Sequence, residues 1–74
     1  MEKLLKILKG IKPEVDFENE TALIENGLLD SFDVIQIINA VSDEFVVDIS
    51  AAEVVPENFN SIQAIWDMIQ RLSE

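Results

Sequence analysis

The stretch SFDVIQIINAVSDEFV, residues 31–46, decides the fold of this 74-residue chain. At about 100° per residue of an α-helix, one set of its apolar side chains falls within a stripe roughly 100° wide, the width of a core-facing surface. The set comprises Val34, Ile37, Ile38, Val41 and Phe45. Asp30 is suited to cap such a helix, and Asp33 places a further carboxylate in its first turn, where the dipole favours anions. We therefore predict a helix over residues 31–46.

Two further amphipathic helices are predicted. Residues 2–12 form the first, and Pro13 ends it because proline lacks the N–H that a helix interior requires. The last runs over residues 61–72, with Asn60 as its expected cap and Gln63 at the matching third position. Their apolar faces are formed by Leu4, Leu5, Leu8 and Ile11 and by Ile62, Ile65, Trp66 and Ile69.

Residues 13–30 are a long connection for so small a chain, and long loops are uncommon in compact domains unless they have a function. Isolated apolar residues in this loop are expected to pack over the core, and residues 21–25 could form one helical turn. The apolar residues are Val15, Phe17, Leu23, Ile24, Leu28 and Leu29.

Residues 49–59 are ambiguous. The segment from Ser50 to Glu53 fits a capping box that would begin a short helical turn, and Pro56 suits the first position of another. Residues 45–49 could also pass for a strand. No long stretch alternates apolar and polar residues with a period of two, as a half-buried strand would. We therefore predict an all-α fold of three main helices plus one or two short turns, in a single domain over residues 1–74.

The net charge of −10 is unevenly distributed along the chain. Four of the five basic residues lie in the first segment, and none lies between Pro13 and Gln70. The four are Lys3, Lys6, Lys9 and Lys12. A surface so acidic repels phosphate backbones and anionic lipid, so neither nucleic acid nor a membrane is expected as a partner. Basic protein surfaces are the expected partners, although the acids could equally serve only to keep a hydrophobic small protein soluble.

No segment contains the roughly 18 consecutive apolar residues that a membrane span requires. Lysines interrupt the N-terminal leucines, so a signal peptide is not expected and the default location is the cytoplasm. A basic amphipathic helix such as residues 2–12 can also mark a membrane-surface anchor, but this one is short for that role.

Self-contained catalysis is not expected. The chain has no histidine and no cysteine, which excludes a Ser-His-Asp triad, a histidine or thiolate metal site and a thiol nucleophile. Its two glycines, Gly10 and Gly27, form no phosphate-binding loop. The acidic pair Asp43-Glu44 lacks the spacing of a calcium loop.

Phe32 and Ile35 do not lie on the core-facing stripe, and Asn39 lies between them on the helical wheel. One interpretation is that the loop over residues 13–30 covers them. The other is an apolar docking patch for a partner, ringed by acids. Because the patch would lie next to Ser31 at the helix start, we predict such a patch. Its predicted members are Phe32, Asp33, Ile35, Gln36, Asn39 and Asp43.

Ser31 itself has two interpretations. A serine at a helix start is most often a cap or a first-turn residue. The same position is favourable for a phosphate ester, since free N–H groups and the positive end of the helix dipole stabilise an anion there. Asp30 and Asp33 oppose that anion, so an attached group would have to point outward into water.

Residues 27–32, GLLDSF, resemble the phosphopantetheine attachment motif of acyl and peptidyl carrier proteins, in which Asp-Ser-Leu opens the second helix. The likeness extends along nearly the whole chain, at matching length and spacing. It includes DEF at residues 43–45, DI at residues 48–49 and PENFNSIQAI at residues 56–65. Asp-Ser alone is a weak motif, but Asp-Ser with these downstream features at the right distances is a strong one.

The resemblance implies a right-handed four-helix bundle, with three main helices, one short helix and a long first loop. It further implies that a phosphopantetheinyl transferase attaches 4'-phosphopantetheine to Ser31, within a motif that includes Asp30. The thiol of that group would hold acyl intermediates as thioesters, which accounts for the missing cysteine. The chain would then be a stand-alone, monomeric, non-catalytic carrier. Its further partners would be acyl- or aminoacyl-loading and acyl-transferring enzymes with basic docking surfaces.

Two departures from the family pattern affect the surface that partner enzymes read. Phe32 replaces the frequent leucine after the serine, and Gln36, Asn39 and Ser42 occupy outward positions that are often glutamate in carriers of fatty-acid synthesis. We therefore expect a specialised pathway rather than housekeeping fatty-acid synthesis. The alternatives are an aminoacyl or peptidyl carrier, such as a D-alanyl carrier, and an acidic helical adaptor without a prosthetic group.

Overall fold

A computed structural model describes residues 2–73 of the chain, and these residues form helices and loops without a strand. The helices are α1 (Glu2–Ile11), α2 (Ser31–Phe45), the 3₁₀-helix η1 (Ala51–Glu53), α3 (Pro56–Phe59) and α4 (Ile62–Leu72). The all-α prediction is confirmed, and the three main helices begin and end within one residue of the predicted bounds. The strand considered for residues 45–49 does not form.

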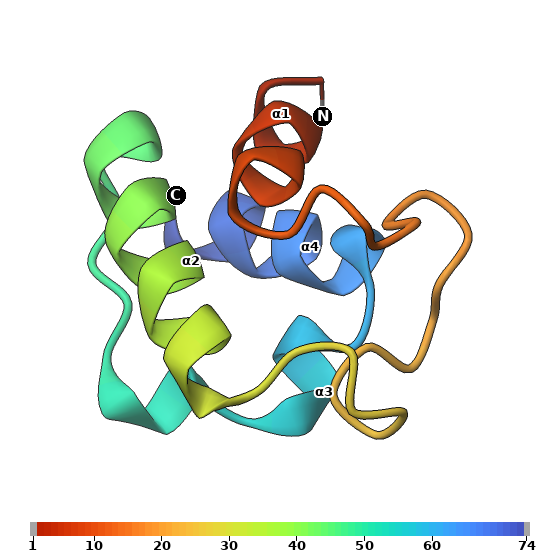
Figure 1. Cartoon of the computed structure of the whole chain (residues 1–74). Helices are drawn as coiled ribbons and strands as arrows, with labels where there is room; N and C mark the ends of the chain where they lie inside the picture. The colour runs from red at the N-terminus through yellow and green to blue at the C-terminus, as the bar shows by residue number, and fades with distance from the viewer. Residues whose placement is uncertain (1, 74) are drawn as a thin grey trace.

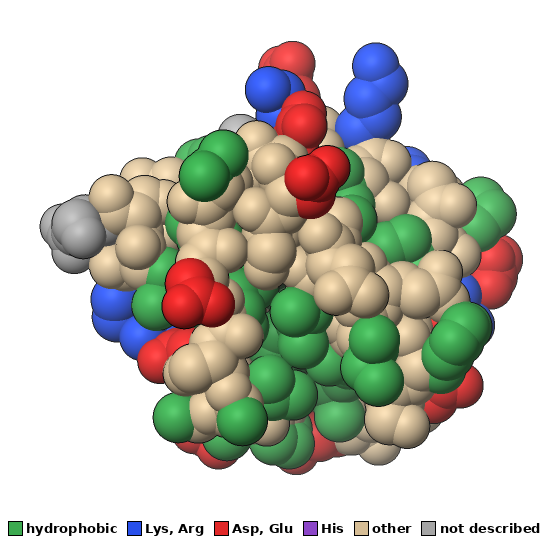
Figure 2. All heavy atoms as spheres, turned by 90° about the vertical axis from the view of Figure 1, so that its left-hand side faces the viewer, with side chains coloured by type: hydrophobic (Ala, Val, Ile, Leu, Met, Phe, Trp, Pro, Cys, Tyr) green, Lys and Arg blue, Asp and Glu red, His purple; other side chains and the backbone are tan. Residues whose placement is uncertain are grey.

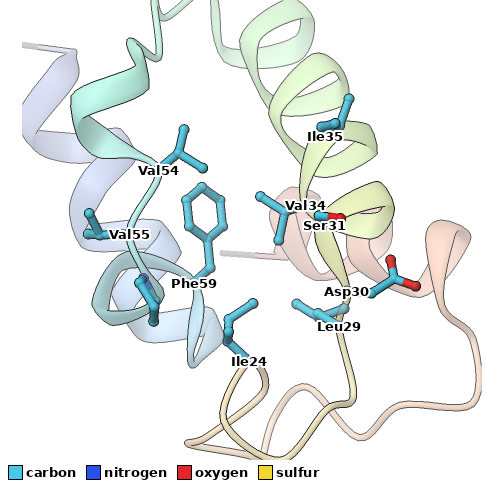
Figure 3. Close-up of a pocket in the computed structure, with 10 residues that line it drawn as sticks. Ile24, Leu29, Asp30, Ser31, Val34, Ile35, Val54, Val55 and Phe59 are labelled. Atoms are coloured by element: carbon cyan, nitrogen blue, oxygen red, sulfur yellow. The ribbon is translucent and has the colours of Figure 1, made fainter.

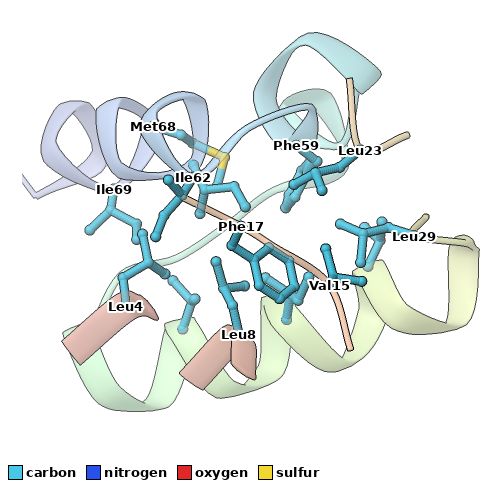
Figure 4. Close-up of a cluster of buried hydrophobic side chains, with 14 of the residues drawn as sticks. Leu4, Leu8, Val15, Phe17, Leu23, Leu29, Phe59, Ile62, Met68 and Ile69 are labelled. Carbon is cyan, nitrogen blue, oxygen red and sulfur yellow. The ribbon is translucent and has the colours of Figure 1, made fainter. Parts of the chain in front are cut away.

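Helix α1 packs against both α2 and α4, and the short α3 packs against α4 (Figure 1). Side chains from all four α-helices and from the first loop meet in one buried hydrophobic cluster (Figure 4). The cluster contains the predicted Leu4 and Leu8 of α1, and Ile62, Ile65 and Ile69 of α4. No helix within residues 2–73 has the length and apolar character to cross a bilayer.

Helix α2 buries most of its predicted core face. Val34, Ile37 and Val41 are buried, whereas Ile38 and Phe45 are only partly buried and pack at the edge of the core. The Phe45 ring meets the Trp66 ring edge to face, with centroids 5.9 Å apart and planes at 76°. This arrangement is favourable for aromatic pairs and closes the core between α2 and α4.

The first loop packs over the core, as predicted from its isolated apolar residues. Val15, Phe17, Leu23 and Leu29 are buried, and Ile24 and Leu28 are partly buried. The helical turn expected at residues 21–25 does not become a helix. The Asn26 N–H donates to the Ala22 carbonyl at 2.8 Å and the Gly27 N–H to the Ile24 carbonyl at 3.1 Å, so residues 22–27 form hydrogen-bonded turns without a regular helix.

The prediction that Asn60 caps the last helix was wrong. Ser61 is the cap, and its Oγ accepts the Ala64 N–H at 3.0 Å. The Asn60 Oδ1 instead accepts the N–H groups of Ile24 at 3.0 Å and Glu25 at 3.3 Å, and the Asn60 carbonyl accepts the Leu23 N–H at 2.8 Å. Asn60 therefore supplies acceptors for three backbone N–H groups of the first loop.

The ambiguous segment forms two short helices. Helix η1 follows Ser50, but the Ser50 side chain makes no cap bond, so the predicted capping box is absent. The Glu53 carboxylate instead pairs with Arg71 of α4 at 2.9 Å. Pro56 occupies the first turn of α3, as predicted.

Replacing Val46 by glycine is expected to stabilise the protein. Helix α2 ends one residue earlier than predicted because Val46 adopts a left-handed conformation, with φ 52° and ψ 53°. A β-branched residue is strained there, and its side chain is 87% exposed, so little packing is lost on its removal. We expect Val46→Gly to raise the free energy of unfolding by about 1 kcal/mol in urea titrations.

Val46→Ala is the matched control for this prediction. Alanine removes most of the same side chain but keeps a Cβ, so we expect less than half of the gain. Equal stabilisation by both substitutions would show that loss of exposed apolar surface, rather than relief of backbone strain, is the cause.

Candidate functional site

Ser31 is the first residue of α2 and is exposed. Asp30 is the N-cap, as predicted, and its Oδ1 accepts the Asp33 N–H at 2.9 Å. The Asp33 Oδ2 in turn accepts the Asp30 N–H at 3.2 Å, which completes a reciprocal capping box. The sequence signal for this box was the Asp-x-x-Asp spacing around Ser31. Because two bonds span the serine, its backbone position is well defined.

Asp33 does not lie on the exposed patch to which it was assigned. Its side chain is turned toward the first loop, and the residue is only 7% exposed. There its Oδ2 lies 3.3 Å from the Nζ of Lys12, a contact that no sequence pattern indicated. The hydrogen bond and charge of Asp33 raise the pKa of Lys12 above its usual value. We therefore leave Asp33 out of the docking surface.

The Asp30 carboxylate is engaged as the cap of α2. Hydrogen bonds to its carboxylate, chiefly from the Asp33 backbone N–H, lower the pKa of Asp30 below its usual value. In Figure 3 this carboxylate also points away from the cleft beside the serine. A carboxylate that is held as a cap and has a low pKa is a weak proton acceptor.

An apolar cleft of about 500 Å³ opens beside Ser31, between the start of α2 and the segment that leads into α3. Leu29 and Val34 face Phe59 across it (Figure 3). The lining residues are Ile24, Leu29, Asp30, Ser31, Val34, Ile35, Val54, Val55, Pro56 and Phe59. Apart from Asp30 and Ser31, every lining side chain is hydrophobic. Periodicity did not reveal this cleft, because its walls come from three separate segments.

Phe32 and Ile35 are 67% and 54% exposed, so the prediction that they lie off the core is confirmed. The first loop does not cover them, which removes the alternative interpretation. Asn39 and Asp43 are also exposed, and Gln36 is partly buried. Figure 2, which views the molecule from the left-hand side of Figure 1, shows hydrophobic side chains gathered on the lower part of that face, with acidic side chains at its edge. Val54, also exposed, was missed because its segment had no clear periodicity.

The arrangement defines a class of protein. Four α-helices enclose one core, and Ser31 follows the cap Asp30 at the start of α2, as the resemblance to carrier proteins predicted. The apolar cleft beside Ser31 was not predicted.

Comparisons with known proteins agree with that class. The chain is 36% identical over 58 residues to an acyl carrier protein of Buchnera aphidicola subspecies Baizongia pistaciae, an alignment that covers 78% of this chain and 72% of the relative. It is 30% identical over 71 residues to aminoacyl carrier protein 1 of Bradyrhizobium diazoefficiens, with 90% of this chain and 78% of the relative covered. No family model and no solved structure matches the chain. The chain belongs to the family of acyl and aminoacyl carrier proteins.

Proposed function

We propose that this protein carries acyl groups on a 4'-phosphopantetheine group attached to the Ser31 hydroxyl. The observation that carries the proposal is the position of Ser31, exposed at the start of α2 and at the rim of the apolar cleft. The family to which the chain belongs implies the phosphopantetheine group. The absence of cysteine is in keeping with a thiol that is supplied from outside the chain.

The residues around Ser31 fit such a group. A phosphodiester on the serine Oγ would lie at the positive end of the α2 dipole. The Asp33 N–H is already bonded to Asp30, so the helix dipole and solvent, rather than this N–H, would stabilise the phosphate. When bound, the group supplies a terminal thiol that holds the cargo as a thioester. The chain itself supplies the hydroxyl, the rigid helix start and the cleft.

The cleft favours an acyl cargo. Its hydrophobic walls and volume of about 500 Å³ suit an aliphatic chain, whose burial contributes roughly 0.8 kcal/mol per CH₂ group. The second candidate is an aminoacyl carrier, which is supported by the relative named as one. A charged amino group would gain nothing from an apolar wall, so we place the acyl carrier first. We further propose a non-catalytic role in a specialised pathway, because Phe32, Gln36 and Asn39 alter the surface next to the serine.

The docking surface for the phosphopantetheinyl transferase and for the loading enzymes is proposed to be Phe32, Ile35, Gln36, Asn39 and Asp43. A large exposed aromatic beside polar and acidic residues is typical of an interface anchor. A basic residue on the partner would meet Asp43, the one acidic side chain of this surface, and speed the encounter.

Phe32→Ala should slow the modification of Ser31 while leaving the fold nearly intact. The side chain is mostly exposed, so the free energy of unfolding should change by less than about 0.5 kcal/mol. Loss of an interface anchor should lower kcat/KM for the transferase about tenfold. Val46→Ala removes an exposed apolar side chain at the other end of α2 and should leave kcat/KM unchanged. A large loss of thermal stability in Phe32→Ala would place Phe32 in the core instead.

The test of the proposed function is the intact mass of the purified wild-type chain. It is incubated with coenzyme A and a broad-specificity phosphopantetheinyl transferase, and peptide mapping then locates the modified residue. We expect the mass of one phosphopantetheine, on the peptide that contains Ser31. An unchanged mass, with a control carrier modified in the same reaction, would overturn the proposal and favour the acidic adaptor.

A further inference from the structure

The start of α2 carries a concentration of negative charge that the proposed modification would increase. Asp30 and Asp33 flank Ser31 within one turn, and a phosphodiester on Ser31 would add a third anion. Lys12 is the one cation that forms an ion pair with this helix start within residues 2–73. The lysine therefore offsets a charge that would otherwise oppose the modification.

Contacts with the end of α1 and with Glu14 also hold Lys12 in place. It directly follows α1, and its backbone N–H donates to the Leu8 carbonyl at 2.9 Å, as a continuation of the helix. Its Nζ lies 3.3 Å from the Asp33 Oδ2 and 3.7 Å from a Glu14 Oε1. The same Asp33 oxygen accepts the Asp30 N–H at 3.2 Å. A continuous set of contacts thus runs from the end of α1 through Lys12 and Asp33 to the residue before Ser31.

Burial makes this ion pair different from an ordinary surface pair. The Asp33 side chain is 10% exposed and the Lys12 side chain 28%, whereas both partners of the Lys3–Glu44 pair are 45% or more exposed. Salt and water screen a partly buried pair less than an exposed one. Removal of the lysine would leave the Asp33 carboxylate buried without a cation and free it to leave the capping box.

We infer that Lys12 is a positioning residue for the modification of Ser31, because it holds Asp33 in the capping box and offsets the anionic charge around the serine. The role of Lys12 in modification rests on the proposed function of the protein. Its role in the capping box rests only on the observed contacts. It assigns a role to the one lysine of the N-terminal segment that contacts the α2 start.

The experiment compares wild type with Lys12→Met, Lys12→Arg and Lys9→Met. Methionine keeps an unbranched side chain without charge, and arginine keeps the charge. Lys9 is an exposed lysine of α1 that forms no ion pair within the described residues, so Lys9→Met controls for net charge. Two quantities are measured. They are kcat/KM for phosphopantetheine addition and the hydrogen-exchange protection of the Asp30 and Asp33 amides in the unmodified chain.

We expect Lys12→Met to lower kcat/KM about tenfold and to lower protection of both amides, since the reacting hydroxyl loses its defined position. Lys12→Arg and Lys9→Met should stay within about twofold of wild type. In an Asp33→Asn background, the side chain at position 33 can still accept the Asp30 N–H but carries no charge. Lys12→Met should then lower kcat/KM much less than it does in the wild-type background. Normal kcat/KM in Lys12→Met, or an undiminished effect in the Asp33→Asn background, would overturn the inference.

The outcomes separate this inference from the proposed function. If wild type is not modified, the carrier function fails, and amide protection still tests the role of Lys12 in the capping box. If wild type and Lys12→Met are modified equally fast, the carrier function stands and the inference fails. A Lys12→Met chain that does not fold would be replaced by Lys12→Gln, with the same expected results.

Discussion

Ser31→Ala is expected to abolish the addition of phosphopantetheine while leaving stability almost unchanged. The hydroxyl is the proposed point of attachment, and alanine offers no oxygen to form the phosphodiester. Ser31 is exposed, and its Oγ makes no hydrogen bond within residues 2–73, because Asp30 caps α2. The free energy of unfolding should therefore change by less than about 0.5 kcal/mol. Intact mass after incubation with coenzyme A and the transferase, together with thermal unfolding, measures both quantities.

Ser61→Ala is the matched control because Ser61 also lies at a helix start. Its Oγ accepts the Ala64 N–H at 3.0 Å, so its loss should destabilise the chain by about 1 kcal/mol. It should leave the mass gain unchanged, the reverse of what we expect for Ser31→Ala. A full mass gain in Ser31→Ala would mean that the group is attached to another residue, and peptide mapping would identify it.

Phe17→Ala is expected to leave the chain only marginally stable. Phe17 comes from the first loop, yet it is fully buried and projects into the middle of the hydrophobic cluster (Figure 4). Truncation of a buried phenylalanine costs about 3–5 kcal/mol in lost burial and in the cavity that remains. The net stability of a chain of this size is on the order of 5 kcal/mol, so little stability would remain. Circular dichroism during urea and thermal unfolding measures the loss.

Phe17→Leu is the control for this prediction. Leucine refills much of the cavity, so the variant should fold with a lower midpoint and should still be modified on Ser31. A Phe17→Ala chain that unfolds within about 1 kcal/mol of wild type would contradict a central role for this loop residue in the core.

The predicted placement of the candidate site residues agrees with the structure where it depends on neighbours along the chain. Asp30 and Ser31 are adjacent, and the exposure of Phe32 and Ile35 follows from the angle between helical positions. Asp33 was wrongly assigned to the exposed patch because a helical wheel does not represent contacts with residues outside the helix. Its carboxylate bonds to the Asp30 N–H and pairs with Lys12, which lies 21 positions earlier in the chain.

The N-cap of α4 shows the same limit of prediction from local sequence. Asn60 and Ser61 are both good N-cap residues, so their local preference does not distinguish them. The choice follows from the first loop, whose N–H groups at Ile24 and Glu25 require an acceptor that Asn60 can supply and Ser61, already bonded to Ala64, does not.

By itself, the sequence determined the three main helices, their core-facing stripes and the serine that opens α2, because helix formation and amphipathicity depend on residues within a few positions of one another. Tertiary structure alone decided the apolar cleft, the Lys12–Asp33 pair and the role of Asn60. Each of these joins segments that are distant in the chain, and such contacts form only when burial of the core brings the segments together. Ser31, the proposed attachment point, is thus a local feature, whereas its surroundings are a product of packing.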